Sequence, residues 1–339
     1  MARSHLTRSR FIAVNLLLAV LLLVSIVTAS LIGTVHIDVG KAVRQDLPNN
    51  VDRVILFDTR VPRVLLAAVV GAALATAGVA LQGLLRNPLA EPHLIGVSGG
   101  AALGAVVAIL LGGRSAFIET SVLPLAAAGG ALVSVAVIYR LAMVRGRLQP
   151  YVLLLAGVVY NAFAGALIMF ANSIADFYAA HGLLFWLMGS LATQSYRLVG
   201  AIAVYSALGV LFLLLQTRQL NVLSLGEEGA LQLGVDVDRT RRVTFIASSL
   251  LVGAVVSVAG MIGFVGLIVP HVMRLLLGAD HRLLMPASLL AGATFLIWAD
   301  TVARTALGVV ELPVGVVTAL CGGPFFVYLL KREGTKVFG

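Results

Sequence analysis

The chain has 339 residues, of which 60% are apolar and only 12% are charged. Soluble domains carry about 25% charged residues, so this composition excludes a soluble globular protein and indicates an integral membrane protein. The net charge of +9 does not indicate a nucleic-acid partner, because the basic residues lie in short loops between apolar runs, where positive charge sets membrane topology.

In chain order, the apolar runs predict about ten membrane-spanning helices, because roughly 20 apolar residues cross a bilayer as a helix. The first run follows basic residues, as in a signal peptide, but it is longer than the usual apolar core of about 7–15 residues, and no clear cleavage site follows. It is therefore predicted to be a span. The predicted spans are 11–32, 64–85, 94–113, 120–139, 149–175, 198–216, two short spans within 243–273, 283–299 and 312–330.

Two stretches are ambiguous in this topology. Residues 243–273 carry no charge over 31 positions, which is long for one span and short for two. Gly260, Gly263 and Gly266 favour a break, and a break places the basic C-terminal tail on the side that holds most basic residues, as positive-inside bias favours. Residues 176–197 predict a partly interfacial helix that leads into the next span.

The predicted spans contain no Asp, Glu, Lys or Arg, and Asp300, Arg304 and Glu311 lie only near span ends. Ion-driven transporters normally keep such residues within their spans. A transporter built on this chain is therefore expected to take its energy from a soluble partner. The sequence has no phosphate-binding glycine loop followed by Lys and Ser or Thr, so we expect no ATP hydrolysis by the chain itself.

The segment 217–242 interrupts the apolar pattern with a cluster of acids and arginines. Ser224 and Glu227 match a capping box that starts a helix, and Gly234 is a plausible stop. Asp236 or Asp238 is predicted to begin a second short helix. Two short helices at an angle form a compact knob for docking a soluble partner; the alternative is a solvated link between two spans.

Two further groups of residues have both a chemical and a structural interpretation. The sequence Gly96-Val97-Ser98-Gly99 fits an intramembrane serine protease activated by His93 or His271, but small residues also permit close helix contact. Arg60 and Arg63 are interpreted as an exposed pair that binds carboxylates of a partner, or as interfacial anchors.

The chain shows no metal-binding pattern. Its histidines lack metal-ligand spacing, and each is interpreted as a loop or interface residue. The single cysteine, Cys321, excludes an internal disulfide and a multi-cysteine metal site. Because Cys321 lies in an apolar run, it is predicted to be a packed core thiol.

Several long motifs together resemble one family, the FecCD-type permeases of iron-chelate, haem and cobalamin ABC importers. The resemblance covers about 60–330. It rests on RVPRVLLAAVVGAALATAGVALQGLLRNPLAEPHLIGVSGGAALGA, LSLGEEGALQLGV, GMIGFVGLIVPHVMRLLLGADHRLLMPASLLAGATFLIWADTVAR and ELPVGVVTALCGGPFFVYLL, which occur in this order.

This resemblance implies an all-α, polytopic membrane protein of the type II ABC importer permease class. It implies one transmembrane domain, 1–339, with about ten helices in which spans two to five and seven to ten form inverted halves, and coupling helices at 217–242. The chain would form a homodimer in the inner membrane with both termini in the cytoplasm. Two ATPase subunits, which carry ATP and Mg, would dock below and a substrate-binding protein above.

The resemblance also implies roles for particular residues, and none of them is catalytic or binds a metal or cofactor. Transport would proceed by alternating access, with the fifth span along the pathway. The cargo would be an iron chelate (siderophore or haem), with cobalamin as the alternative. The implied residues are Leu225, Gly226, Glu227, Glu228, Ala230, Leu233 and Gly234 for ATPase coupling, Asn87, Pro88 and Leu89 for the cytoplasmic gate, and Arg60, Arg63 and Arg304 for binding-protein docking.

Overall fold

The computed structural model describes residues 7–44, 49–112, 121–192, 195–308 and 310–337, most of which are helical. The long helices are α1 (Arg8–Leu31), α4 (Val61–Leu85), α5 (Val97–Gly112), α6 (Leu123–Ala142), α7 (Pro150–Ile174), α9 (Tyr196–Leu215), α12 (Val237–Ala259), α13 (Val265–Leu277), α14 (His281–Thr305) and α15 (Val314–Val337). The short helices are α2 (Val39–Val43), α3 (Val51–Arg53), α8 (Phe177–Leu187), α10 (Thr217–Leu223) and α11 (Glu227–Gln232). A π-helical segment, Val54–Arg60, leads into α4, a 3₁₀ turn, Pro92–Ile95, precedes α5, and the hairpin of β1 (Met143–Val144) and β2 (Arg147–Leu148) joins α6 to α7.

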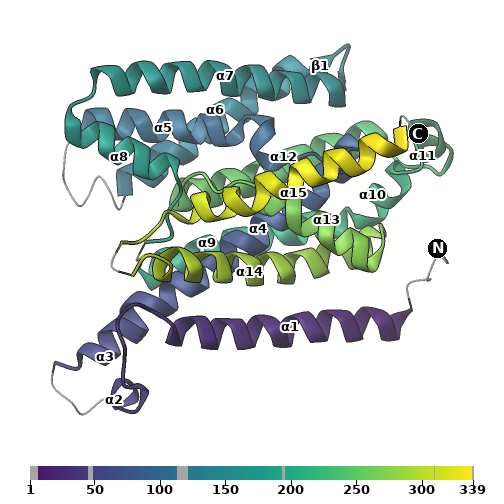
Figure 1. Cartoon of the computed structure of the whole chain (residues 1–339). Helices are drawn as coiled ribbons and strands as arrows, with labels where there is room; N and C mark the ends of the chain where they lie inside the picture. Colours follow the sequence, from purple (N-terminus) through teal and green to yellow (C-terminus); the bar gives the residue numbers. More distant parts are fainter. Residues whose placement is uncertain (1–6, 45–48, 113–120, 193–194, 309, 338–339) are drawn as a thin grey trace.

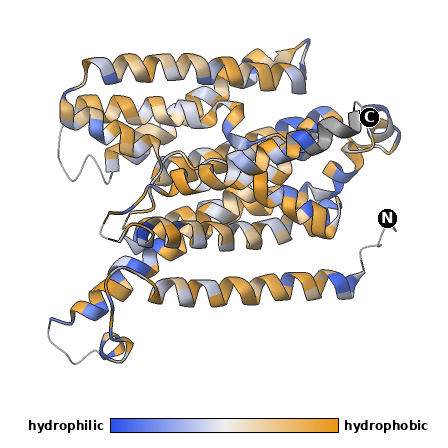
Figure 2. Cartoon of the chain, in the orientation of Figure 1, coloured by the Kyte–Doolittle hydropathy of each residue, from blue (hydrophilic) through white to orange (hydrophobic). Residues whose placement is uncertain are grey.

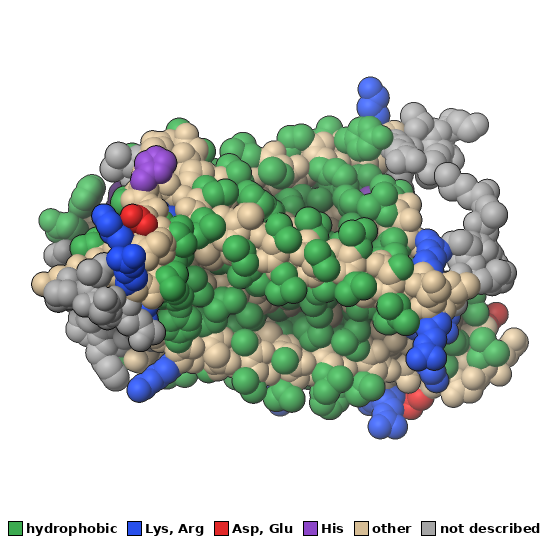
Figure 3. Space-filling view, turned by 90° about the horizontal axis from the view of Figure 1, so that it is seen from below, with side chains coloured by type: hydrophobic (Ala, Val, Ile, Leu, Met, Phe, Trp, Pro, Cys, Tyr) green, Lys and Arg blue, Asp and Glu red, His purple; other side chains and the backbone are tan. Residues whose placement is uncertain are grey.

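The long helices form one bundle that has the dimensions and polarity of a membrane domain. Among the described residues, seven helical segments are long and apolar enough to cross a membrane, and α5, α13 and the apolar part of α15 are shorter. On the face shown in Figure 3, hydrophobic side chains cover the middle of the bundle, and Lys and Arg gather at its two ends. The hydropathy colours in Figure 2 likewise show mostly hydrophobic residues along the long helices. The all-α, polytopic prediction with about ten spans is confirmed.

The two ends of the bundle differ. The knob helices α10 and α11 lie at the end that also holds the start of α1 and the end of α15, whereas α2, α3 and α8 lie at the opposite end (Figure 1). As predicted, a short helix, α8, precedes the next span, and the Asp176 side chain caps it by accepting from the backbone N–H of Ala179 at 2.8 Å.

The predicted break within 243–273 is confirmed, because α12 ends at Ala259 and α13 begins at Val265. Gly260 and Phe264 have positive φ angles of 68° and 67°, so the backbone turns sharply at both ends of the break. Non-helical backbone at membrane depth is tolerated only where protein covers it. Here the carbonyl oxygen of Trp186 lies only 2.5 Å from the position a Cβ on Gly260 would take, so the break is covered by the C-terminal end of α8.

The two halves of the bundle repeat the same contacts. Helix α4 packs on α14 as α12 packs on α6, and the contacts among α5, α6 and α7 have counterparts among α13, α14 and α15. Each half also has a non-helical break, one before α5 and one before α13. This arrangement agrees with the inverted halves found in many transporters.

Glycine allows the central helices to approach at backbone distance. A Cβ added to Gly71 on α4 would lie 2.2 Å from the carbonyl oxygen of Gly292 on α14, and one added to Gly78 would lie 2.0 Å from the carbonyl oxygen of Gly266 on α13. Small residues at helix interfaces replace the hydrophobic driving force that a membrane lacks. They make α4 the centre of the bundle.

One prediction about the interior is wrong. Cys321, predicted to be a packed core thiol, is exposed on the surface of α15. In a membrane protein, the residues of an apolar run can face either lipid or the protein interior. Cys321 lies on the side of α15 that faces away from the rest of the bundle.

Candidate functional site

The segment 217–242 forms a projection at one end of the bundle (Figure 1). It contains α10 and α11 and then enters α12; residues 217–234 are called the knob below. Leu223, Ala230 and Val237 are buried together in a small core that holds α11 against its neighbours. Ala230, implied to be a coupling residue, is therefore part of the interior of the knob.

The outer face of the knob is apolar. Leu225, Leu231 and Leu233 are 69%, 61% and 63% exposed, and Glu227 and Glu228 on the same turn are also exposed. An exposed apolar patch with polar residues around it is typical of an interaction site. Leu231 was missed by the sequence analysis, although an apolar residue within a polar segment outside the spans is a signal that could have identified it.

The predicted capping box is wrong. Ser224 Oγ donates to the carbonyl oxygen of Asn221 at 2.6 Å, and α11 begins instead after Gly226. The φ of 110° at Gly226 is a conformation that glycine adopts readily and other residues do not. Gly234, with a φ of 75°, follows the end of α11 as predicted.

The second predicted short helix is also wrong. Asp236 caps a helix, and its side chain accepts from the backbone N–H of Arg239 at 2.9 Å. That helix is the long membrane helix α12, and the helix that completes the knob is α10, on the other side of α11. Local capping signals identify a helix start but not the length of the helix that follows.

Glu227 anchors the knob to α12. Its carboxylate pairs with the guanidinium of Arg241, which is only 3% exposed. The hydrogen bond from Arg241 lowers the pKa of the Glu227 carboxyl from its ordinary value. Because this pair joins α11 to the first turns of α12, a movement of the knob would be transmitted directly to a membrane helix.

The residues implied to form the cytoplasmic gate follow α4 in an ordered turn. Asn87 Oδ1 accepts from the backbone N–H of Leu89 at 2.9 Å, and the carbonyl oxygen of Asn87 accepts from Ala90 at 3.1 Å. An Asn side chain that bonds the backbone two residues onward is a common device for fixing a turn. Helix α4 also contacts α10, so this turn lies next to the knob.

The three arginines implied to dock a binding protein are buried, and the prediction of an exposed pair is wrong. Arg60, Arg63 and Arg304 are 5%, 8% and 5% exposed. The guanidinium of Arg63 donates to both oxygens of Asp300 on α14, from Nε at 3.0 and 3.1 Å and from Nη2 at 3.0 Å, and also to Glu311 at 2.7 Å. Arg63 thereby joins α4 to α14.

The other two arginines hold the end of α1. Arg304 donates to the carbonyl oxygens of Ala29 and Ile32, at 2.6 and 2.9 Å, and Arg60 donates to that of Leu31 at 2.8 Å. These carbonyl groups lie at the C-terminal end of α1, where no backbone N–H further along the helix can donate to them. The sequence could not show this role, because it depends on three distant segments meeting at one end of the bundle.

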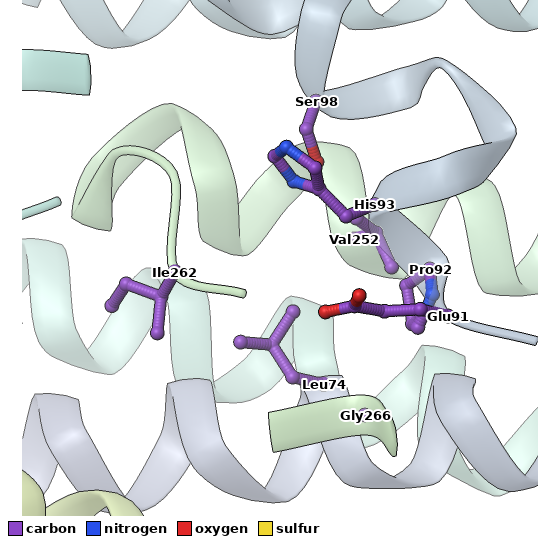
Figure 4. A pocket seen from close by; sticks show the side chains of 8 residues that line it. All are labelled: Leu74, Glu91, Pro92, His93, Ser98, Val252, Ile262 and Gly266. Carbon is purple, nitrogen blue, oxygen red and sulfur yellow. The ribbon is translucent and has the colours of Figure 1, made fainter. Parts of the chain in front are cut away.

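An ionisable residue between the predicted spans 64–85 and 94–113 reaches into the bundle. Glu91 lies between α4 and α5, and it lines a small cavity together with His93, Ser98, Leu74 and residues from α12 and α13 (Figure 4). The centre of a water molecule can occupy about 10 Å³ of this cavity, which is roughly enough for one water. The bundle therefore does contain a carboxylate in its interior.

The serine-protease interpretation of Ser98 is not supported by this cavity. Figure 4 shows the ring of His93 beside the hydroxyl of Ser98, one of the pairs the sequence suggested. However, Ser98 is only 2% exposed, and the cavity has room for a single water. A peptide bond could not reach the hydroxyl group.

Comparison with known proteins identifies the family. The sequence model of the FecCD transport family matches residues 18–332. The chain belongs to the FecCD transport family. The cobalamin import system permease protein BtuC of Halobacterium salinarum is 46% identical to this FecCD chain over 286 residues, which cover 84% of the chain and 75% of that protein. The hemin transport system permease protein HmuU of Yersinia pestis is 41% identical over 281 residues, which cover 82% and 84%.

A solved structure agrees with this assignment. A metal-chelate type ABC transporter in an inward-facing conformation superposes on the FecCD chain with a TM-score of 0.81 at 34% identity, covering 95% of the chain and 99% of its own. The chain is therefore a multi-pass membrane permease of the ABC importer type, with the fold that the sequence motifs implied. FecCD permeases work with ATPase and substrate-binding partners.

Proposed function

We propose that this permease imports a metal-chelate compound, using ATP hydrolysed by separate ATPase subunits that dock on the knob. The observation that carries the proposal is the exposed face of Leu225, Leu231 and Leu233, with acids beside it, on a folded projection at one end of the bundle. A membrane helix follows it directly and is bound to it through Glu227. The knob end would face the cytoplasm, with both termini.

The rest of the assembly follows from this docking. Two copies of the chain would form a homodimer with the pathway between them, and each would receive one ATPase subunit that binds ATP and Mg. A binding protein would deliver the cargo at the opposite end, where Arg60, Arg63, Arg304 and the half-exposed Glu311 lie. Closure of the ATPases would move the knob and the turn at 87–89, and the pathway would open alternately to each side.

The proposed cargo is a large organic metal chelate. We favour an iron chelate, a siderophore or haem, as the family resemblance implies, and the 41% identical hemin permease supports this choice. The second candidate is cobalamin, which the 46% identical cobalamin permease supports. Uptake of labelled ferric siderophore, haem and cobalamin by proteoliposomes that contain the permease, its ATPase and its binding protein would separate them.

The knob is tested most directly by Leu231→Glu. Leu231 is exposed, so the substitution should not disturb the fold, whereas a charge within an apolar interface should reduce copurification of the ATPase by about tenfold, or about 1.4 kcal/mol. The matched control is Leu307→Glu, because Leu307 is 59% exposed after α14 at the opposite end of the bundle. Undiminished ATPase binding by Leu231→Glu would exclude this face of the knob as the docking surface.

A further inference from the structure

Glu91 joins the two halves of the bundle through a single side chain. Its carboxylate accepts a hydrogen bond from the backbone N–H of Phe264, 173 residues further along the chain. Phe264 is the residue immediately before α13. The first N–H groups of a helix lack partners within the helix and form the positive end of its dipole, so a carboxylate stabilises the start of α13.

The backbone that Glu91 holds is strained. Phe264 has a φ of 67°, which is unusual for a bulky residue. Such a conformation persists only where the surroundings impose it, and it is found preferentially at segments that switch. The contact from Glu91 therefore stabilises a conformation that Phe264 would otherwise tend to leave.

The other side of Phe264 contacts α15. A Cβ added to Gly322 would lie 2.1 Å from Cγ of the Phe264 ring, so the ring rests directly on the α15 backbone. The preceding residue, Cys321, is exposed on the outer surface of α15. A displacement of Phe264 must therefore move α15 or break its contact with it.

The segment that precedes Glu91 in the chain lies next to the knob. Arg86 ends α4 in a left-handed conformation, and its Nη1 atom lies 3.7 Å from the position a Cβ on Gly226 would take. The turn fixed by Asn87 connects Arg86 to Glu91 through four residues, among them Pro88. This turn is short and internally hydrogen-bonded, so it forms an ordered connection between the knob and Glu91.

We infer that Glu91 is a positioning residue for transport: it transmits the displacement of the knob through Phe264 to α15. The inference rests on the proposed function, since it assumes that ATPase subunits move the knob. Glu91 contacts no cargo in this scheme. It acts by holding the start of α13, and through it α15, in register with the turn after α4.

The single cysteine allows a direct test. Wild-type permease assembled with its ATPase is treated with a fluorescent maleimide, without nucleotide and with ATP, Mg and vanadate. The labelling rate at Cys321 should change by about fivefold or more between the two states, the lower end of typical coupling between distant sites. In Glu91→Ala the change should be lost while ATP hydrolysis continues. Glu91→Gln, which keeps an acceptor oxygen, should restore most of it.

The matched control is Ser134→Ala, which removes a buried hydroxyl that donates only within α6, to the carbonyl oxygen of Ala131 at 2.7 Å; it should respond as the wild type does. A nucleotide-dependent change at Cys321 that persists in Glu91→Ala would overturn the inference, as would a wild-type complex in which Cys321 does not respond. Failure of the ATPase to bind even the wild-type permease would instead refute the proposed function.

Discussion

The substitution Asp300→Asn tests whether the arginines at one end of the bundle are structural. The Asp300 side chain is 1% exposed and lies between the Arg63 and Arg304 side chains, which are 9% and 6% exposed. It accepts three hydrogen bonds from Arg63 at 3.0–3.1 Å. Removing one member of a buried ion pair costs about 3–5 kcal/mol, because the remaining charge stays buried without compensation.

We expect Asp300→Asn to lose at least about 3 kcal/mol of unfolding free energy, since two buried arginines then face each other with only the half-exposed Glu311 beside Arg63. Titration of the purified permease with SDS in mixed micelles, followed by tryptophan fluorescence, would measure it. Trp298 is a suitable reporter, because it lies on α14 two residues before Asp300, and its indole N–H donates to Ser25 Oγ on α1 at 3.0 Å. Arg63→Met should cost a similar amount, and the two substitutions should not add, because each removes the partner of the other.

The control is Glu311→Gln. Glu311 also pairs with Arg63, but its side chain is 55% exposed, so its loss should cost less than about 1 kcal/mol. If Asp300→Asn and Arg63→Met both unfold within about 1 kcal/mol of the wild type while binding-protein affinity falls, the arginines serve docking rather than the fold, and the reasoning from burial is refuted.

Three further predictions concern the bundle and its ends. Gly71→Ala should prevent stable assembly of the bundle, because its Cβ would lie 2.2 Å from the carbonyl oxygen of Gly292; thermal aggregation in detergent would show it, and wild-type behaviour would contradict the close approach. Asp236→Ala should cost about 1 kcal/mol through loss of the α12 cap, measured in the same SDS titration. The hydrogen bond from Arg282 lowers the pKa of Asp280 to about 2. The ionised Asp280 carboxylate therefore stabilises the fold fully above its unfolded pKa of about 4, and this stabilisation is lost as the pH falls through about 2. In Asp280→Asn, the loss of stability in this pH range should be smaller than in the wild type by the contribution of this group.

Much of the architecture follows from local patterns in the sequence. The lengths of the apolar runs predicted about ten helices, and the glycines at 260–266 predicted the break between α12 and α13. The concentration of charge at 217–242 predicted a folded segment outside the spans. These features were predictable because burial in lipid requires an unbroken apolar helix and because glycine and charge interrupt such helices locally.

The roles of several polar residues depended on contacts that no local pattern encodes. Arg63 was interpreted as exposed because it follows a polar loop, yet Asp300, 237 residues away, buries it. Cys321 was interpreted as buried because its neighbours are apolar, yet its side of α15 faces outward.

The sequence by itself determined that this protein is a bundle of membrane helices with one polar projection, because hydropathy acts on each segment separately. The tertiary structure alone decided which side chains hold that bundle together. Glu91 lies outside every predicted span, and it links the two halves only because the chain returns to it at Phe264. The pairing of distant residues depends on which helix faces meet, and that is a property of the assembled bundle.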